Sequence, residues 1–284
     1  MIYLKNGDAK ARISETGAEL KSFNYKNIEY IWQGDKNVWK GSAPLLFPIC
    51  GGLIDDKYIL NGKTYNLQKH GYARFCDFTV ESVSKISATF LLKSNDESKT
   101  HFPFDYELRV TFRLNEKNIS VEYNVKNLTD KTMYFSIGAH DGYACTGGIE
   151  DYDVIFPQKE TLNSYILNGN LLEHNTVPII ENSDRIALDY KYFAVDALVF
   201  KDLKSRSATL KNRNTGRAVK VEFHDCDYFL LWTIPGANYI CMEPWCGVQD
   251  SVDSNKDITK KEGILTLEGG NTFSCTHSIS VVED

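Results

Sequence analysis

Apolar and polar residues alternate with a period of two along much of this chain. In the segment DYELRVTFRL, apolar side chains from Tyr106 to Leu114 occupy every second position. A turn over residues 115–118 follows, and residues 119–127 repeat the alternation. Because successive side chains of a strand point to opposite faces, this pattern predicts an antiparallel hairpin with one solvent-facing side.

A second hairpin is predicted in YILNGKTYNL, where Asn61 and Gly62 supply a tight turn. No long run has an apolar period of 3.6, although DITKKEGIL predicts one helical turn. No Gly-, Pro- or Ser-rich linker and no internal repeat divides the chain. We therefore predict an all-β protein, a single large antiparallel β-sandwich domain over residues 1–284. Further short strands are expected within residues 79–93, 194–200, 207–212, 218–224, 228–234 and 273–282.

Composition narrows the classes of partner. The 284 residues are 42% hydrophobic, which is enough for a substantial core. The net charge is −6 and the basic residues are scattered, which argues against nucleic-acid binding. No apolar run approaches the ~18 residues of a membrane span, and the first residues lack the pattern of a signal peptide. The expected partner is a small molecule, with no nucleic acid and no membrane.

The cysteines indicate a reducing compartment. There are seven, an odd number, and no C-x-x-C pair occurs. This favours buried free thiols over a disulfide framework or a thiolate zinc site, and hence a cytoplasmic protein.

One carboxylate stands out in YICMEPWCG. Residues 239–242 are typical of a buried strand, but Glu243 follows directly. A buried carboxylate is costly unless it is paired or hydrogen-bonded. Pro244 cannot donate a ladder hydrogen bond, so we predict that it ends the strand and lets Glu243 face a cleft.

Two histidines have similar positions. His70 opens HGYAR after the second predicted hairpin, and His140 ends the apolar run MYFSIGAH. Singly, each histidine fits a hydrogen-bonded structural role, and Glu243 fits a carboxylate that binds a loop amide. Together the three groups predict a site for proton transfer on one face of the sandwich. The other histidines are interpreted as structural or exposed, namely His101, His174, His224 and His277.

Five segments in this order resemble the aldose 1-epimerase (galactose mutarotase) family. They are APLLFPICGG, HGYAR, IGAHDGY, CMEPWCG and KEGILTLEGGNTFS. The resemblance runs from about Lys10 to Val282 and is strongest to the mutarotase-like branch of bacterial sugar operons. It implies a large β-sandwich, often called a supersandwich, with a cleft on one concave sheet.

The resemblance also implies roles for particular residues. Glu243 corresponds to the general base, His140 to the general acid, and His70 to a histidine that assists at the ring oxygen. Arg74 in HGYAR and Asp196 in YFAVDALVF correspond to residues that hold sugar hydroxyls. One departure concerns the substrate: many relatives carry an Arg soon after the FP segment, where this chain has Gly52. Trp245, Phe47 and Tyr143 lie beside the key segments, either to stack on a sugar or as core residues.

Mutarotation suits such a set of groups. A proton must leave the anomeric hydroxyl and another must reach the ring oxygen, so a carboxylate and an imidazolium on opposite sides meet the need. No metal or other cofactor is required, and no motif for one occurs. Burial would raise the pKa of Glu243 and a cationic histidine would lower it, and the sequence leaves the balance open. We predict an aldose 1-epimerase of free aldoses, an isomerase, as a monomer or homodimer.

Other functions stay open at this point. A hexose 6-phosphate 1-epimerase would need additional basic residues at the cleft mouth. Arg74 is available, but the missing Arg near Gly52 counts against it. A non-catalytic carbohydrate-binding protein is argued against by the presence of all three ionisable groups. A metal site of two His and one Glu is compatible with the residue types. A glycosidase would require two carboxylates flanking the bond.

Overall fold

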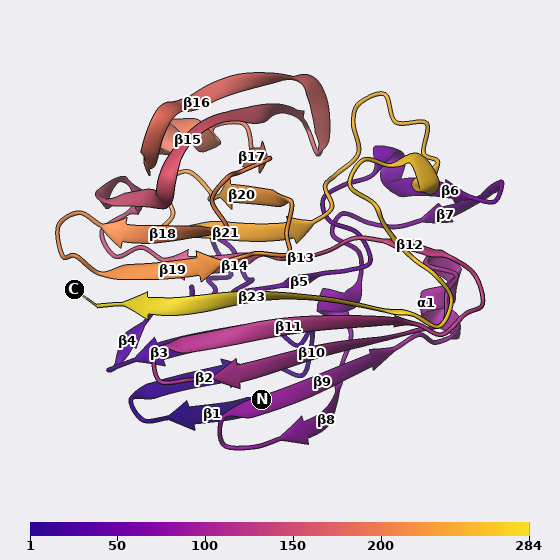
Figure 1. The fold of residues 1–284 in the computed structure, drawn as a ribbon, viewed down its shortest axis with the longest axis horizontal. Coiled ribbons are helices and arrows are strands. Elements are labelled where there is room, and N and C mark those ends of the chain that lie inside the picture. Colours follow the sequence, from indigo (N-terminus) through magenta and orange to yellow (C-terminus); the bar gives the residue numbers. More distant parts are fainter. Residues whose placement is uncertain (284) are drawn as a thin grey trace.

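The computed structural model describes residues 1–283, and antiparallel strands dominate it (Figure 1). The largest sheet has nine strands, and its neighbours β10 and β11 form the long hairpin predicted from the alternating pattern. In spatial order the strands are β16 (Leu171–Ala187), β15 (Tyr152–Asn168), β18 (Ser207–Asn212), β19 (Ala218–Glu222), β23 (Thr272–Val282), β11 (Asn118–Asn127), β10 (Tyr106–Leu114), β9 (Ser87–Lys93) and β8 (Thr79–Val83).

A six-stranded sheet carries the segments with ionisable groups. Its central strand β21 pairs with β20 on one side and with both β13 and β14 on the other. The strands are β17 (Leu198–Lys201), β20 (Tyr228–Trp232), β21 (Tyr239–Cys246), β13 (Ile137–Ala139), β5 (Leu45–Leu46) and β14 (Asp141–Ala144). The hairpin β15–β16 arches over β17, β20 and β21 (Figure 1).

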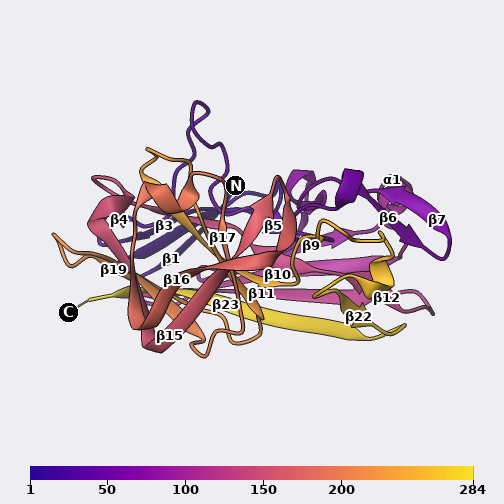
Figure 2. The same cartoon turned by 90° about the horizontal axis from the view of Figure 1, so that it is seen from above.

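The remaining strands form three smaller sheets. The N-terminal four-stranded sheet lies on one side of β10, β11 and β23, as the view from above shows (Figure 2). It contains β1 (Ile2–Asn6), β2 (Ala9–Ile13), β3 (Leu20–Tyr25) and β4 (Ile28–Glu29). The predicted hairpin with the Asn61–Gly62 turn is β6 (Lys57–Leu60) and β7 (Lys63–Asn66), and both turn residues have positive φ. The last pair is β12 (Met133–Phe135) with β22 (Leu265–Leu267).

Helical structure is sparse, as the absence of a 3.6 period predicts. The single α-helix of the described residues, α1 (Asp96–His101), begins with a capping box between Asn95 and Ser98. The predicted turn in DITKKEGIL is a 3₁₀ turn at Ile258–Lys260. Other 3₁₀ turns lie at Ile54–Asp56, Ala73–Phe75, Ile149–Asp151 and Tyr190–Phe193. None of the helices in residues 1–283 is long and apolar enough to cross a membrane.

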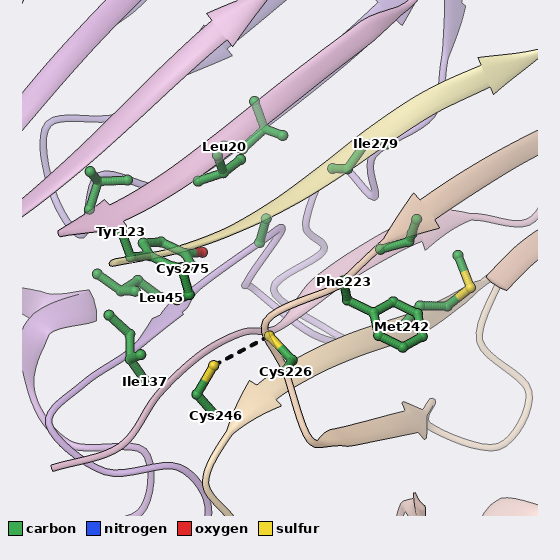
Figure 3. Close-up of a cluster of buried hydrophobic side chains, with 14 of the residues drawn as sticks. Leu20, Leu45, Tyr123, Ile137, Phe223, Cys226, Met242, Cys246, Cys275 and Ile279 are labelled. Carbon is green, nitrogen blue, oxygen red and sulfur yellow. Dashed lines mark hydrogen bonds between the residues drawn. The ribbon is translucent and has the colours of Figure 1, made fainter. Parts of the chain in front are cut away.

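The core lies between the six-stranded sheet and the large sheet. Figure 3 shows part of it, where Met242 and Cys246 of β21 point toward the layer that contains Ile279 of β23. All seven cysteines are free and six are buried, as predicted, while Cys76 is partly exposed. Cys226 and Cys246 are hydrogen-bonded with their sulfurs 3.4 Å apart (Figure 3). These thiols therefore act as small apolar core residues.

The prediction that Pro244 ends its strand is wrong. β21 continues through Glu243 and Pro244 to Cys246, and Phe229 of β20 pairs with Pro244. On the other side, the ladder of β14 stops at Met242 and that of β13 resumes at Trp245. Pro244 is tolerated because it lies where β21 has no ladder partner on that side.

Candidate active site

A cleft on the outer face of the six-stranded sheet contains all five site residues predicted from the sequence. The space within it, counted together with the open solvent at its mouth, is about 770 Å³. Strands β20 and β21 form its floor, and the tip of the β15–β16 hairpin forms part of its rim. The lining residues are Trp39, Gly51, Lys69, His70, Arg74, His140, Leu167, Asn170, Asp196, Ala197, Leu230, Trp232, Glu243, Trp245 and Gln249.

Strand register brings His140 opposite Glu243. Gly138 pairs with Trp245 on one side of the ladder gap, and Asp141 pairs with Met242 on the other. Both pairs belong to one continuous register, so His140 faces Glu243 across the gap. Residues directly opposite in an antiparallel pair share a face of the sheet. Accordingly, His140 Nε2 lies 3.5 Å from Glu243 Oε2.

The backbone groups released at this gap have other partners. The His140 N–H donates to Pro44 O over 3.1 Å. The Trp245 indole Nε1 donates to Ala139 O, also over 3.1 Å. Buried backbone groups need such partners, and their hydrogen bonds hold the gap in one conformation. The distance between His140 and Glu243 is thus set by the sheet and not by a mobile loop.

Burial controls the protonation of the pair. The Glu243 side chain is 2% exposed and that of His140 is 12% exposed. Removal from water raises the pKa of Glu243 well above its usual range and lowers the pKa of His140 to about 3. Glu243 Oε2 and His140 Nδ1 have no hydrogen-bond partner among residues 1–283. Burial therefore favours the uncharged form of both groups, a protonated Glu243 carboxyl beside an unprotonated His140 imidazole.

His70 is fixed by the loop that follows β7. Its backbone N–H donates to Gly51 O over 2.8 Å, and its Nδ1 accepts from the Gly51 N–H over 3.1 Å. In the neutral ring the proton is consequently on Nε2. Burial, followed by the neighbouring His140, lowers the pKa of His70 well below its usual value. The next residue must be glycine, because a Cβ on Gly71 would lie 2.2 Å from Phe47 O.

Arg74 and Asp196 lie at the mouth of the cleft with a lysine that the sequence analysis missed. Arg74 Nη2 donates to Lys69 O over 2.8 Å, while its buried Nε has no partner among the described residues. Asp196 Oδ1 accepts from the Ala197 N–H, and Asp196 Oδ2 lies 3.9 Å from Lys69 Nζ. Lys69 directly precedes HGYAR, so its position in the sequence was the available signal.

The aromatic residues of the cleft differ in part from those proposed. Trp245 lines it, but Phe47 and Tyr143 are fully buried in the core. Trp39 and Trp232 flank His140 instead, with ring centroids 5.2 Å and 5.4 Å from the imidazole. Trp232 shares the Glu243 face because it pairs with Cys241, two residues before Glu243. Alternation along β20 could have identified it.

A second imidazole–carboxylate pair lies on the opposite face of the same sheet. Asp141, the neighbour of His140, points into the core and accepts a hydrogen bond of 2.9 Å from His277. Both side chains are buried. The sequence-based interpretation of His277 as a structural residue agrees with this position.

Among residues 1–283, one candidate set of transition-metal ligands lies at the floor of the cleft and just beneath it. His140, Cys241 and Glu243 each offer one ligand atom, and these atoms lie within 4.8 Å of one another. The set contains Cys241 in place of the second histidine considered from the sequence. A metal there would occupy the imidazole and carboxylate atoms of the His140–Glu243 pair.

Comparisons with known proteins agree with this architecture. A family model described as aldose 1-epimerase matches residues 1–280. The plasmid and chromosomal LacX proteins of Lactococcus lactis subsp. lactis are each 34% identical to this chain over 296 aligned positions, covering 99% of both sequences.

Two solved structures are also similar over nearly their whole length. A galactose mutarotase related enzyme from Lactobacillus acidophilus is 32% identical, with a TM-score of 0.93 and coverage of 99% of this chain and 97% of that one. A galactose mutarotase-like protein from Lactobacillus casei ATCC 334 is 31% identical, with a TM-score of 0.94 and coverage of 99% and 100%. The chain belongs to the aldose 1-epimerase family.

Proposed function

We propose that the protein interconverts the α and β anomers of a free aldose, with Glu243 as general base and His140 as general acid. The observation that carries this proposal is the His140–Glu243 pair on the floor of the cleft, with its imidazole and carboxylate 3.5 Å apart and largely buried. Membership of the aldose 1-epimerase family supports the same reaction.

In this mechanism the pair holds one proton for its two sites, because burial disfavours the charged form of each group. Movement of that proton from Glu243 to His140 creates a carboxylate and an imidazolium without a net change in charge. The carboxylate then removes the proton of the anomeric hydroxyl while the imidazolium protonates the ring oxygen. Rotation about the bond between the first two carbons and closure in reverse yield the other anomer, and the pair returns to its initial state. Each group is expected to contribute roughly 10²- to 10⁴-fold.

The remaining residues orient the sugar in this proposal. His70 presents Nε2–H toward the ring oxygen, because its Nδ1 is occupied by Gly51. Arg74 and Asp196 hold hydroxyls at the mouth, and Trp39, Trp232 and Trp245 provide apolar surface for the ring faces.

A phosphorylated hexose is the second candidate, since Lys69 adds a cation near Arg74. Lys69 is already bound to Asn170 and lies 3.9 Å from Asp196, which favours the free sugar. Polarimetry or NMR exchange on matched free and 6-phosphorylated aldoses tests both. We expect faster exchange with the free sugars. Faster exchange with the phosphates would select the second candidate, and binding without exchange would indicate a non-catalytic carbohydrate-binding protein.

A further inference from the structure

The tip of the β15–β16 hairpin is anchored beside the strand that carries Glu243. The Leu172 N–H donates to Asp250 O over 2.8 Å, and the Val252 N–H donates to Leu172 O over 2.9 Å. Leu172 thereby forms a short parallel bridge with Ser251, just beyond β21. These bonds hold Asn170, two residues before Leu172, at the rim of the cleft.

Asn170 occupies space that a side chain at position 52 would need. A Cβ added to Gly52 would lie 2.9 Å from Asn170 Cβ and 3.3 Å from Asn170 O. Contacts below 3.0 Å require one of the two groups to move, and here both groups are close to the backbone. Gly52 is itself held in place, because its carbonyl accepts from the Asp250 N–H over 2.9 Å. Asn170 can therefore lie at the rim of the cleft because position 52 has no side chain.

Lys69 fixes the orientation of the Asn170 amide. Lys69 Nζ donates to Asn170 Oδ1 over 2.7 Å. With Oδ1 serving as the acceptor, Nδ2 and its two hydrogens remain to donate. Lys69 Nζ also lies 3.9 Å from Asp196 Oδ2. One lysine thus holds an amide donor and a carboxylate acceptor around the same point of the cleft mouth.

Such a group of donors and an acceptor matches a hydroxyl, which can accept from one neighbour and donate to another. We propose that Asn170, oriented by Lys69, is a specificity-determining residue that binds a sugar hydroxyl remote from the anomeric carbon, and that Gly52 is the permissive position behind it. This inference rests on the proposed function, because it assigns a substrate contact to the same cleft.

The hydrogen bond from Asn170 is expected to affect affinity and leave proton transfer intact. A neutral hydrogen bond contributes a net ~0.5–1.5 kcal/mol, equivalent to about 2- to 13-fold. Asn170→Gly should therefore lower kcat/KM for the preferred aldose by about 3- to 10-fold. The loss should come from KM, with kcat changed less than about twofold. The variant should show no further loss on the deoxy analogue that lacks the contacted hydroxyl.

Gly52→Ala should produce the same pattern by displacing Asn170. In the Asn170→Gly background the Cβ at 2.9 Å is gone and only the carbonyl contact at 3.3 Å remains, so Gly52→Ala should have little further effect. Asn168→Ala is the matched control, since Asn168 lies at the same hairpin tip but bonds to Glu173 and does not line the cleft. It should leave the substrate profile unchanged.

The experiment measures kcat/KM by polarimetry and Kd by calorimetry for galactose, glucose, xylose and their deoxy analogues, with the four variants and the parent. A selective loss with Asn170→Gly supports the inference. An active parent whose variants lose nothing, or lose equally on every sugar, overturns it and leaves the proposed function standing. A parent that neither binds nor turns over any sugar of the panel overturns both.

Discussion

Glu243→Gln is expected both to lower the turnover of the protein and to raise its melting temperature. Gln has the shape of a protonated Glu but cannot accept a proton as a base. If Glu243 is the general base, turnover should fall by roughly 10²- to 10⁴-fold. The fold should persist, because burial already favours the uncharged form of Glu243 and raises its pKa well above the usual range.

The gain in stability follows from proton linkage. In the unfolded chain this carboxyl ionises near its ordinary pKa of 4.5, whereas the folded state retains the proton to higher pH. Between these two pKa values the folded state binds more protons, so the free energy of unfolding decreases as pH rises. The decrease is about 1.4 kcal/mol per pH unit. Gln does not titrate, and its variant should therefore melt about 2–3 °C higher for each unit by which the folded pKa exceeds 4.5.

Calorimetry at pH 5 and pH 8, together with NMR anomer exchange, measures both effects. The difference in melting temperature should be larger at pH 8. Asp141→Asn provides a contrast, because Asp141 is a buried carboxylate of the same sheet with a structural partner in His277. That variant should melt lower than the parent. Turnover like that of the parent in Glu243→Gln would show that Glu243 is not the base, and a lower melting temperature would refute the linkage argument.

Three further outcomes are expected. The kcat/KM profile should decline on the acid side only as His140 titrates near pH 3, and it should decline toward higher pH as Glu243 ionises, at a pH well above the usual carboxyl range. An acid-side decline set by an ordinary histidine pKa near 6.5 would contradict this. Asp196→Asn should raise KM by about 3- to 10-fold with kcat changed less than twofold, and an equal loss in kcat would contradict a binding role. Added Zn²⁺ should inhibit turnover, and Cys241→Ser should weaken that inhibition, because Cys241 belongs to the candidate ligand set. EDTA should leave turnover unchanged, and a loss of turnover in EDTA would indicate a required metal.

The sequence predicted the β-rich fold well because alternation directly reports which side chains share a face. The hairpins β6–β7 and β10–β11 were found in this way. The long hairpin β15–β16 was not, because its outer half is largely exposed and its register shifts several times, which obscures the period. The residues Asn168 and Gly169 at its tip were the available turn signal.

The sequence predicted the ionisable groups of the candidate site but not the strand pairing and tertiary contacts that bring its residues together. His70, His140 and Glu243 could be singled out because each departs from its apolar surroundings. The continuation of β21 past Pro244 could not be predicted, since it depends on a gap in the neighbouring ladder that arises from pairing between distant segments. Lys69 and Asn170 meet only through tertiary contact, 101 positions apart in the chain.

The alternation of His140 and Asp141 along one edge of β21 has a consequence for folding. In the native register, His140 faces Glu243 and Asp141 faces His277. A slip of one residue between these strands would exchange the two faces. It would bring the Asp141 carboxylate against Glu243, confront His140 with His277, and leave both imidazoles without a carboxylate. Two carboxyl groups buried at close range cannot both ionise readily, and the same holds for the protonation of two imidazoles, so the shifted register is disfavoured. The His140–Glu243 pair proposed to move protons would thus also disfavour a shifted register between these strands.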